Sequence, residues 1–110
     1  MIKTQENVFQ TARSTQLRQY DLEERTFVFA QNVRVFVKGI PKRAANIEDV
    51  KQVVRASGSV GANYIEANES LSKKDFLMRI RICRKEAKES GYWLRLIDAG
   101  DGPGSKEAAG

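Results

Sequence analysis

Three long segments with helical periodicity constrain the fold of this chain most strongly. Each opens with a residue whose side chain can accept hydrogen bonds from free backbone N–H groups, and an acidic residue follows three positions later. These pairs are Asp21 with Glu24, Asn46 with Asp49, and Ser72 with Asp75. Because an apolar run at helical spacing follows each pair, we expect helices over about residues 22–38, 47–69 and 73–97.

The lengths of these helices predict an all-α, up-and-down antiparallel bundle. Each of the last two would span roughly 35 Å, and their very short connection makes them antiparallel neighbours. Gly39 and Pro41 should end the first helix, through a left-handed cap and a ring that interrupts the hydrogen-bond ladder. Residues 21–97 would form the bundle domain, residues 1–20 a flexible or weakly helical segment, and glycine-rich residues 98–110 a disordered tail.

The stretch RASGSVGANYIEANES, residues 55–70, concentrates small residues inside the second predicted helix. It lacks the lysine and hydroxyl of a phosphate-binding loop, and no strand precedes it. A helix-turn-helix reading would place the turn at Gly61 and the basic third helix in a DNA groove. However, the apolar register of Val53, Val60 and Tyr64 runs straight through the glycines. We therefore predict one continuous helix, thin enough at Gly61 for a neighbour to approach closely.

A polar stripe runs along the same helix and consists of Gln52, Arg55, Ser59, Asn63, Glu66 and Ser70. These residues fall within about 80° of arc at 3.6 residues per turn. Three interpretations stay open at this point. The stripe is a solvated face, a hydrogen-bonded seam between subunits, or a small binding surface.

The third predicted helix has two apolar arcs, which suggests contact with two neighbours. One arc comprises Phe76, Ile80, Cys83, Ala87 and Leu94, and the other comprises Met78, Ile82, Trp93 and Leu96. Glu86 and Glu89 lie among apolar residues, so both should be partly buried. They would then need partners such as Arg79, Asn63 or Arg55.

The positive charge of the chain is local to this third helix. Residues 73–95 contain eight basic and three acidic side chains, which accounts for the whole net charge of +5. Five of the basic residues share one face and are the candidates for contacts with RNA phosphates: Lys74, Arg81, Arg84, Lys85 and Lys88. A lysine- and arginine-rich helix face is also commonly just solvated. The alternative function is a protein-interaction scaffold that docks a partner on Phe27, Val28 and Val35.

The composition argues against several other classes of protein. The chain has no histidine and one cysteine, so the commonest general base, the commonest metal ligand and any internal disulfide are missing. Glu86 and Glu89 could be read as metal ligands, but bundle metal sites usually add histidines. We therefore expect no enzyme activity, no cofactor and no metal. No apolar run is long enough to span a membrane and no signal-peptide core is visible, so we expect a cytoplasmic protein.

Three stretches of the sequence resemble one family of bacterial proteins. They are YDLEERTFVFAQNVRVFVKGIP, VRASGSVGANYIEANES and SKKDFLMRIRICRKEAKESGYWLRLI. Their order and spacing over residues 20–97 resemble the four-helix-bundle family named for the 23S rRNA intervening-sequence protein. Its hallmarks are similar to Arg25, Thr26, Phe29, Ala30, Pro41, Ser59, Val60, Ala62, Asn63, Glu66, Lys74, Asp75, Phe76, Glu86, Glu89, Trp93 and Leu94 here.

The resemblance implies a ring-shaped homo-oligomer, expected to be a pentamer, and an association with ribosomal RNA. That association is genetic, because members are encoded in insertions within ribosomal RNA genes, and direct RNA binding is inferred from it. The family continues after the YWL region with a fourth helix, whereas this chain continues with DAGDGPGSKEAAG. We expect residues 7–20 or another subunit to cover the apolar arc that the fourth helix would cover.

Overall fold

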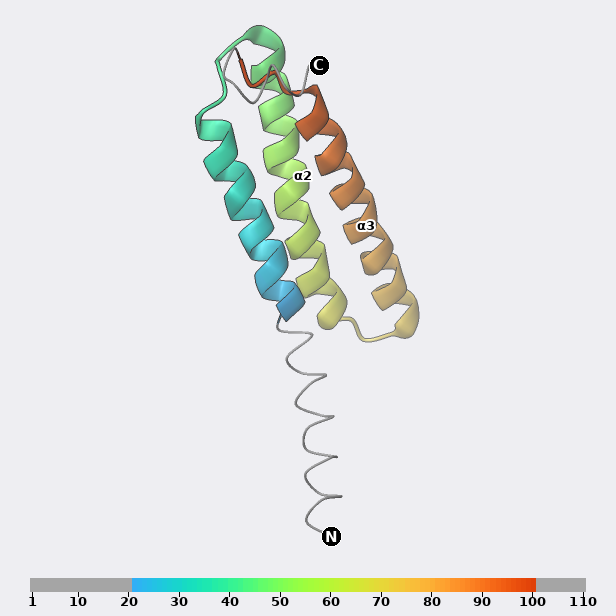
Figure 1. Cartoon of the computed structure of the whole chain (residues 1–110). Coiled ribbons are helices and arrows are strands. Elements are labelled where there is room, and N and C mark those ends of the chain that lie inside the picture. Colours follow the sequence, from blue (N-terminus) through green and yellow to red (C-terminus); the bar gives the residue numbers. More distant parts are fainter. Residues whose placement is uncertain (1–20, 101–110) are drawn as a thin grey trace, which may run out of the picture.

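The described part of the chain, residues 21–100 of a computed structural model, consists of three helices and contains no strand. The first helix covers residues 21–38, α2 is Ala44–Asn68, and α3 is Lys73–Leu96. The helices run up and down, and α2 lies between the other two (Figure 1). The predicted all-α, up-and-down bundle is therefore confirmed for these residues. The predictions for residues 1–20 and 101–110 lie outside them.

Of the helix caps predicted from the sequence, the one at Ser72 is confirmed and the one at Asn46 is wrong. Ser72 caps α3 as predicted, since its Oγ accepts a hydrogen bond from the Asp75 N–H at 3.1 Å. The prediction for Asn46 was wrong, because α2 already begins at Ala44 and its N-cap, Arg43, makes no side-chain cap. Asp21 is itself helical. A capping pattern marks the neighbourhood of a helix start, but a cap-like side chain can be used for tertiary contacts instead.

Asn46 makes such a tertiary contact, and it ties the end of α3 to the start of α2. The side chain is 3% exposed, and its Nδ2 donates to the carbonyl oxygens of Pro41 at 3.0 Å and Asp98 at 2.8 Å. Its Oδ1 accepts from the Asp98 N–H at 3.0 Å. Arg43 adds an ion pair to the Asp98 carboxylate at 3.0 Å. Residues 98–100, the first part of the predicted tail, are thus held against the bundle.

The first helix ends in a tighter last turn of the 3₁₀ type rather than in a left-handed cap. The Gly39 N–H donates to the Phe36 carbonyl and the Ile40 N–H to the Val37 carbonyl, both at 3.2 Å. Such bonds to the third preceding residue close a last helical turn. Among residues 21–100, Gly100 alone has a positive φ, of 93°. The left-handed conformation predicted at Gly39 was therefore wrong.

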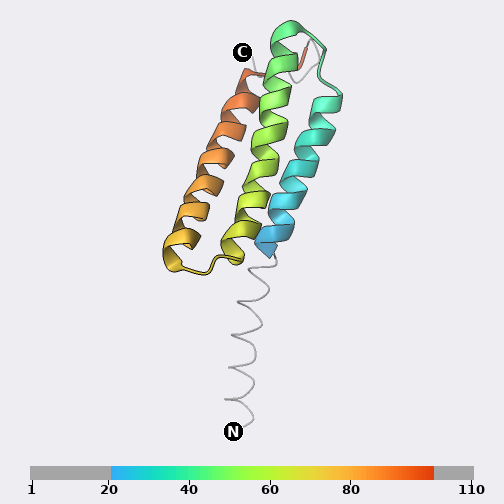
Figure 2. The same ribbon diagram turned by 180° about the vertical axis from the view of Figure 1, so that it is seen from behind.

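α2 is continuous through both of its interior glycines, as the apolar register predicted. The close approach at Gly61 is also confirmed. A Cβ atom added there would lie 3.0 Å from Oγ1 and 3.4 Å from Cβ of Thr26 on the first helix. Seen from behind, the first helix and α3 flank α2 on its two sides (Figure 2). The thin stretch of α2 thus lets the first helix lie close to it.

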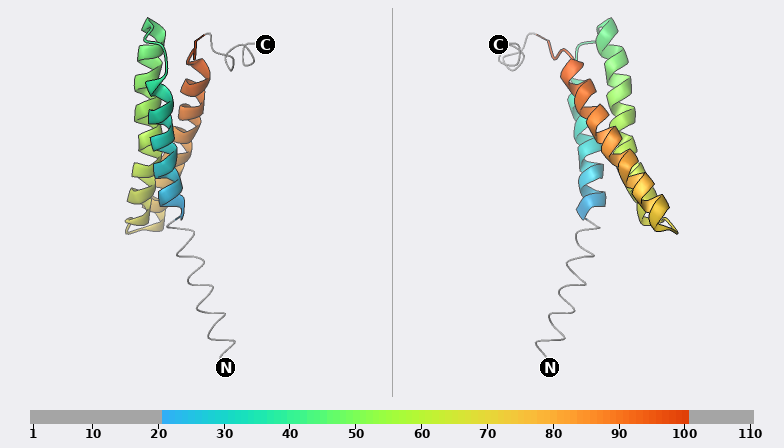
Figure 3. Two further views of the ribbon diagram at one scale, coloured as in Figure 1. Left: turned by 60° about the vertical axis from the view of Figure 1, so that its left-hand side comes forward. Right: turned by 90° about the vertical axis from the view of Figure 1, so that its right-hand side faces the viewer.

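The hydrophobic core is concentrated near the end of the bundle where the first helix joins α2. Val33, Val53 and Ile97 form its buried centre, and partly buried apolar side chains pack around it: Phe29, Val37, Ile40, Val50, Trp93 and Leu94. Toward the connection between α2 and α3, the first helix and α3 diverge (Figure 3). Phe76, a large side chain in this region, is consequently more than a third exposed.

The buried face of α3 is polar at its centre. Glu86 and Ser90 are the residues of α3 that are buried, and Ser90 is fully so. The two predicted apolar arcs lie on either side of this line rather than at its centre. The α2–α3 interface is therefore built from small and polar side chains, with the larger apolar groups at its margins.

Candidate functional site

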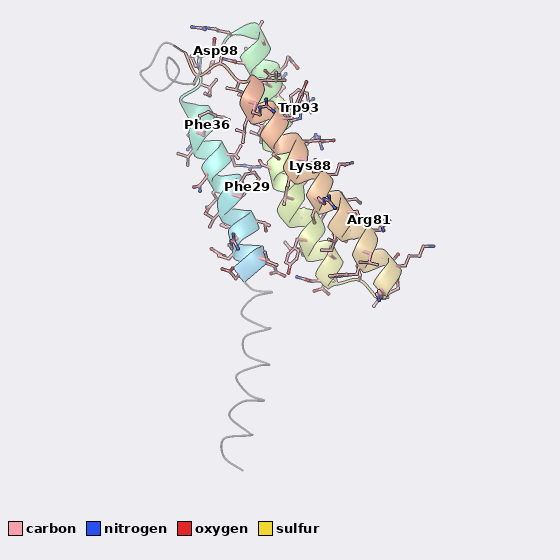
Figure 4. All side chains as sticks on the ribbon, turned by 45° about the vertical axis from the view of Figure 1, so that its right-hand side comes forward. Phe29, Phe36, Arg81, Lys88, Trp93 and Asp98 are labelled. Atoms are coloured by element: carbon pink, nitrogen blue, oxygen red, sulfur yellow. The ribbon has the colours of Figure 1, made fainter. Side chains whose placement is uncertain are left out.

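The five basic residues singled out in the sequence lie on the outward face of α3. Lys74, Arg81, Arg84, Lys85 and Lys88 are all exposed. They follow one another over about four helical turns, or roughly 21 Å at 1.5 Å per residue, opposite the buried line of Glu86 and Ser90. Arg81 and Lys88 both lie on the side of α3 that faces away from the first helix (Figure 4). The structure thus brings all five together on one solvent-facing strip, here called the basic face.

Most of the positive charge on the basic face is not neutralised by neighbouring carboxylates. Lys85 pairs with Glu86 at 3.8 Å, and among residues 21–100 no ion pair involves the other four. Cations that hold no carboxylate partner can neutralise the phosphates of a polyanion and so release the counterions condensed on it. The basic face is therefore available, in electrostatic terms, for an anionic polymer.

Apolar side chains interrupt the basic face near the start of α3. A shallow hollow of about 520 Å³ lies among Lys74, Asp75, Leu77, Met78, Arg81, Ile82 and Lys85. Leu77 and Met78 are 43% and 47% exposed. The aliphatic stems of lysine and arginine lie readily along such side chains while their charged ends stay in water.

The polar stripe of α2 meets α3 of the same chain. Arg55 Nη1 lies 3.6 Å from Glu86 Oε2, and Arg55 Nη2 lies 3.5 Å from Glu89 Oε2. One guanidinium therefore bridges two carboxylates that are one helical turn apart, as the sequence suggested for these acids. The Glu86 side chain is 8% exposed and Arg55 is 54% exposed. The bridge thus compensates a buried charge from the edge of the interface.

A second polar contact joins the helices nearer the connection between them. Arg79 Nη1 donates to Asn63 Oδ1 at 3.2 Å, and Asn63 Nδ2 donates to the Ser59 carbonyl at 2.8 Å. Ser59 Oγ in turn donates to the Arg55 carbonyl at 3.0 Å. Seven residues were expected to form a polar seam or interface, namely Arg55, Ser59, Asn63, Glu66, Arg79, Glu86 and Glu89, and six of them are thus connected within one chain. Glu66 is the exception, since it is exposed and its side chain forms no hydrogen bond within residues 21–100.

Some buried polar atoms in the described part of the chain lack a hydrogen-bond partner. They are Asn68 Oδ1, Glu86 Oε2 and Trp93 Nε1. Glu86 Oε2 still has the Arg55 guanidinium nearby, beyond hydrogen-bond distance. Leaving Glu86 Oε2 without a hydrogen bond costs free energy, so this buried carboxylate depends on the Arg55 guanidinium for compensation.

The described residues hold no constellation typical of metal binding. Within residues 21–100, no group of three or more histidine, cysteine, aspartate or glutamate side chains could hold a metal ion. Cys83 is half-buried, and this burial raises the pKa of its thiol above the usual range. A thiol in that condition is a weak nucleophile at neutral pH.

A groove between the first helix and α2 was not predicted from the sequence. It has a volume of about 460 Å³ and is lined by Glu23, Thr26, Phe27, Ala30, Gln31, Arg34, Gly58, Gly61, Ala62 and Ile65. Asn68 Nδ2 donates to Glu23 Oε1 at 2.8 Å near one end. The small residues of α2 form part of its lining, so the signal for it was the glycine-rich stretch itself.

The fold and these surfaces define a small helical-bundle protein with a basic outer face and a polar seam inside the chain. Among the described residues, no helix is both long and apolar enough to cross a membrane. The chain belongs to the family described as 23S rRNA-intervening sequence protein, which it matches over residues 8–101. Comparison with curated proteins and with solved structures gives no significant match.

Proposed function

We propose that this protein is a non-enzymatic, RNA-binding bundle whose basic face contacts the phosphate backbone of structured ribosomal RNA. The observation that carries the proposal is the unneutralised charge on α3. Four of its five cations make no ion pair within residues 21–100. The name of the family associates its members with 23S ribosomal RNA, which makes this RNA the first candidate.

The expected mode of contact follows from the side chains present. The cations are spread along roughly 21 Å of helix, a length that can follow several consecutive phosphates. The described aromatic side chains do not form a row on this face that could stack unpaired bases. Recognition would therefore depend on the shape and backbone of a folded RNA rather than on base sequence.

Self-assembly is part of the same proposal, with a pentameric ring as the expected state. The divergence of the first helix from α3 supports it, because Phe76 lies at the diverging end and is 37% exposed. Phe36, near the other end of the first helix, is 45% exposed as well. Large apolar side chains left in water favour association with another surface. A ring would also repeat the basic face around its circumference, which raises the avidity for a long polyanion.

Salt dependence tests RNA binding directly. A fluorescently labelled, base-paired fragment of 23S ribosomal RNA is titrated with protein, and its anisotropy is followed at about 50 and 200 mM salt. Five phosphate contacts predict a salt slope of about −3.5 to −4.5, hence a loss of affinity on the order of a hundredfold or more between these conditions.

Matched charge variants separate the basic face from general attraction. Arg84→Glu/Lys88→Glu should abolish binding, whereas Lys42→Glu/Lys51→Glu changes the net charge equally away from α3 and should retain most of it. All four of these side chains are exposed, so both variants should fold. Absence of binding at low salt, or equal loss in both variants, would refute the proposal.

A protein-interaction scaffold without a role in nucleic-acid binding is the second candidate. It is favoured by the exposure of Phe27, Val28 and Val35, which are 56%, 39% and 65% exposed. Such a scaffold predicts weak salt dependence and no affinity for the RNA fragment. A protein partner would then be sought with these three residues as the docking surface.

A further inference from the structure

The outward side of the first helix carries an apolar stripe with charged ends. Val33 faces the core and is 4% exposed, whereas the opposite side of the helix is solvent-facing. This side, here called the outer stripe, consists of Glu24, Phe27, Val28, Gln31, Val35 and Lys38, all of them exposed. The members recur at spacings of three, four and seven residues, so they line one side of the helix.

The outer stripe is complementary to itself when it is reversed about Gln31. Phe27 and Val35 lie four residues to either side of Gln31, and Glu24 and Lys38 lie seven residues to either side. Two such helices placed antiparallel would therefore oppose Phe27 to Val35 of the partner subunit, and Glu24 to Lys38 of the partner subunit. We propose that two copies of this chain associate through their outer stripes, antiparallel and with Gln31 on the two-fold axis.

The charges at the two ends of the outer stripe favour the antiparallel pair over a parallel one. In a parallel pair, Glu24 would meet Glu24 of the partner subunit and Lys38 would meet Lys38 of the partner subunit, and like charges repel. In the antiparallel pair both contacts join opposite charges. Within residues 21–100, neither Glu24 nor Lys38 is already engaged in an ion pair. Exposed pairs add little affinity, so their role is to set orientation while the apolar residues drive association.

The groove beside the stripe provides room for the partner's side chains. Phe27, Gln31 and Arg34 form one wall of it. The other wall includes Ile65, which is 52% exposed. The apolar surface therefore continues from the first helix onto α2, and two helices packed along it would bury both edges of the groove.

The pairing rests on a different surface from the proposed RNA contact and from any ring contact at the diverging side of the bundle. Each copy gains one partner through it, so the assembly that the rest of the chain forms becomes at least twice as large. Failure of RNA binding would thus leave it intact, and its own failure would leave the basic face intact.

Sedimentation of the full chain with charge variants tests the pairing. Glu24→Lys alone should raise the dissociation constant about tenfold or more, because both contacts become repulsive. The exchanged variant Glu24→Lys/Lys38→Glu should recover the original constant. A mixture of the Glu24→Lys chain and the Lys38→Glu chain should associate with each other in preference to themselves. Val35→Glu should weaken pairing about a hundredfold, since a carboxylate would be buried in each copy.

Cysteine cross-linking determines the orientation independently. In a Cys83→Ser background, chains with Phe27→Cys are mixed with chains with Val35→Cys and oxidised under mild conditions. Antiparallel pairing predicts disulfide-linked dimers in the mixture and little product from either chain alone. A mass that is unchanged by Val35→Glu, failure of the exchanged variant to recover association, or cross-linking of Phe27→Cys with itself would overturn the proposal.

Discussion

The contact between Gly61 and Thr26 allows a close test of the packing argument. Replacing Gly61 by alanine should gain about 1 kcal/mol, because alanine is the better helix former. The added Cβ would lie 3.0 Å from Thr26 Oγ1 and 3.4 Å from Thr26 Cβ. That hydroxyl donates to the Glu23 carbonyl at 2.9 Å, which resists its displacement. Overpacking of this kind costs about 1–3 kcal/mol, so Gly61→Ala should destabilise the fold by about 1 kcal/mol.

Gly91 is the matched control for this substitution. It lies within α3, and nothing comes within 4 Å of a Cβ added there. Gly91→Ala should therefore stabilise the protein by about 1 kcal/mol through helix propensity alone. On a Thr26→Ala background the clash is removed, and Gly61→Ala should then become stabilising as well.

Urea unfolding followed by circular dichroism at 222 nm measures these differences. With a slope of roughly 1 kcal/mol per M urea, the two glycine variants should differ in midpoint by about 2 M. Gly61→Leu should lower the midpoint further, because a larger side chain must displace the first helix. If Gly61→Ala raised the midpoint as much as Gly91→Ala does, the close-approach reasoning would be refuted.

Three further perturbations probe the polar contacts and the thiol. Asn46→Ala removes three hydrogen bonds to a buried side chain and should cost about 2–4 kcal/mol in urea unfolding, while Asp98→Ala, which keeps the backbone bonds, should cost under about 1. Arg55→Ala should cost about 1–2 kcal/mol, because Glu86 keeps a buried charge, and the cost should shrink on a Glu86→Gln background. Cys83 should react with iodoacetamide more slowly in the native than in the urea-unfolded protein at pH 8, since burial raises its pKa. Because the native thiol holds its proton more tightly, this group's contribution to stability should fall as the pH rises through the unfolded thiol's pKa.

The helices and the continuity of α2 could be predicted from the sequence because local rules decide them. The apolar spacing of α2 continues through Gly58 and Gly61. The Ser72 side chain caps α3 by accepting a hydrogen bond from the backbone N–H of Asp75, three residues later. The partners of Glu86 and Glu89 were also predictable in kind. A carboxylate among apolar residues requires a nearby cation or hydrogen-bond donor, and Arg55 was one of the partners expected for both acids.

Other features depend on contacts that no local pattern encodes. Asn46 looks like a helix cap in sequence, but its partner Asp98 lies 52 residues away. The sequence marks the two apolar arcs of α3, but no local pattern shows that Ser90 is fully buried between them beside Glu86. The groove beside the first helix depends on how two helices sit against each other, which periodicity does not determine.

The polar seam has a consequence for how the two longest helices are held in alignment. Small side chains such as Ala56 and Ser90 give a smooth surface along which α3 could slide at little hydrophobic cost. From Arg55 to Asn63 is eight residues along α2, and from their partners Glu86 to Arg79 is seven residues back along α3. A shift of one turn, about 5.4 Å, would break both contacts together and leave the Glu86 carboxylate buried without its cation. The two contacts of the seam therefore fix a single axial register of α3 against α2.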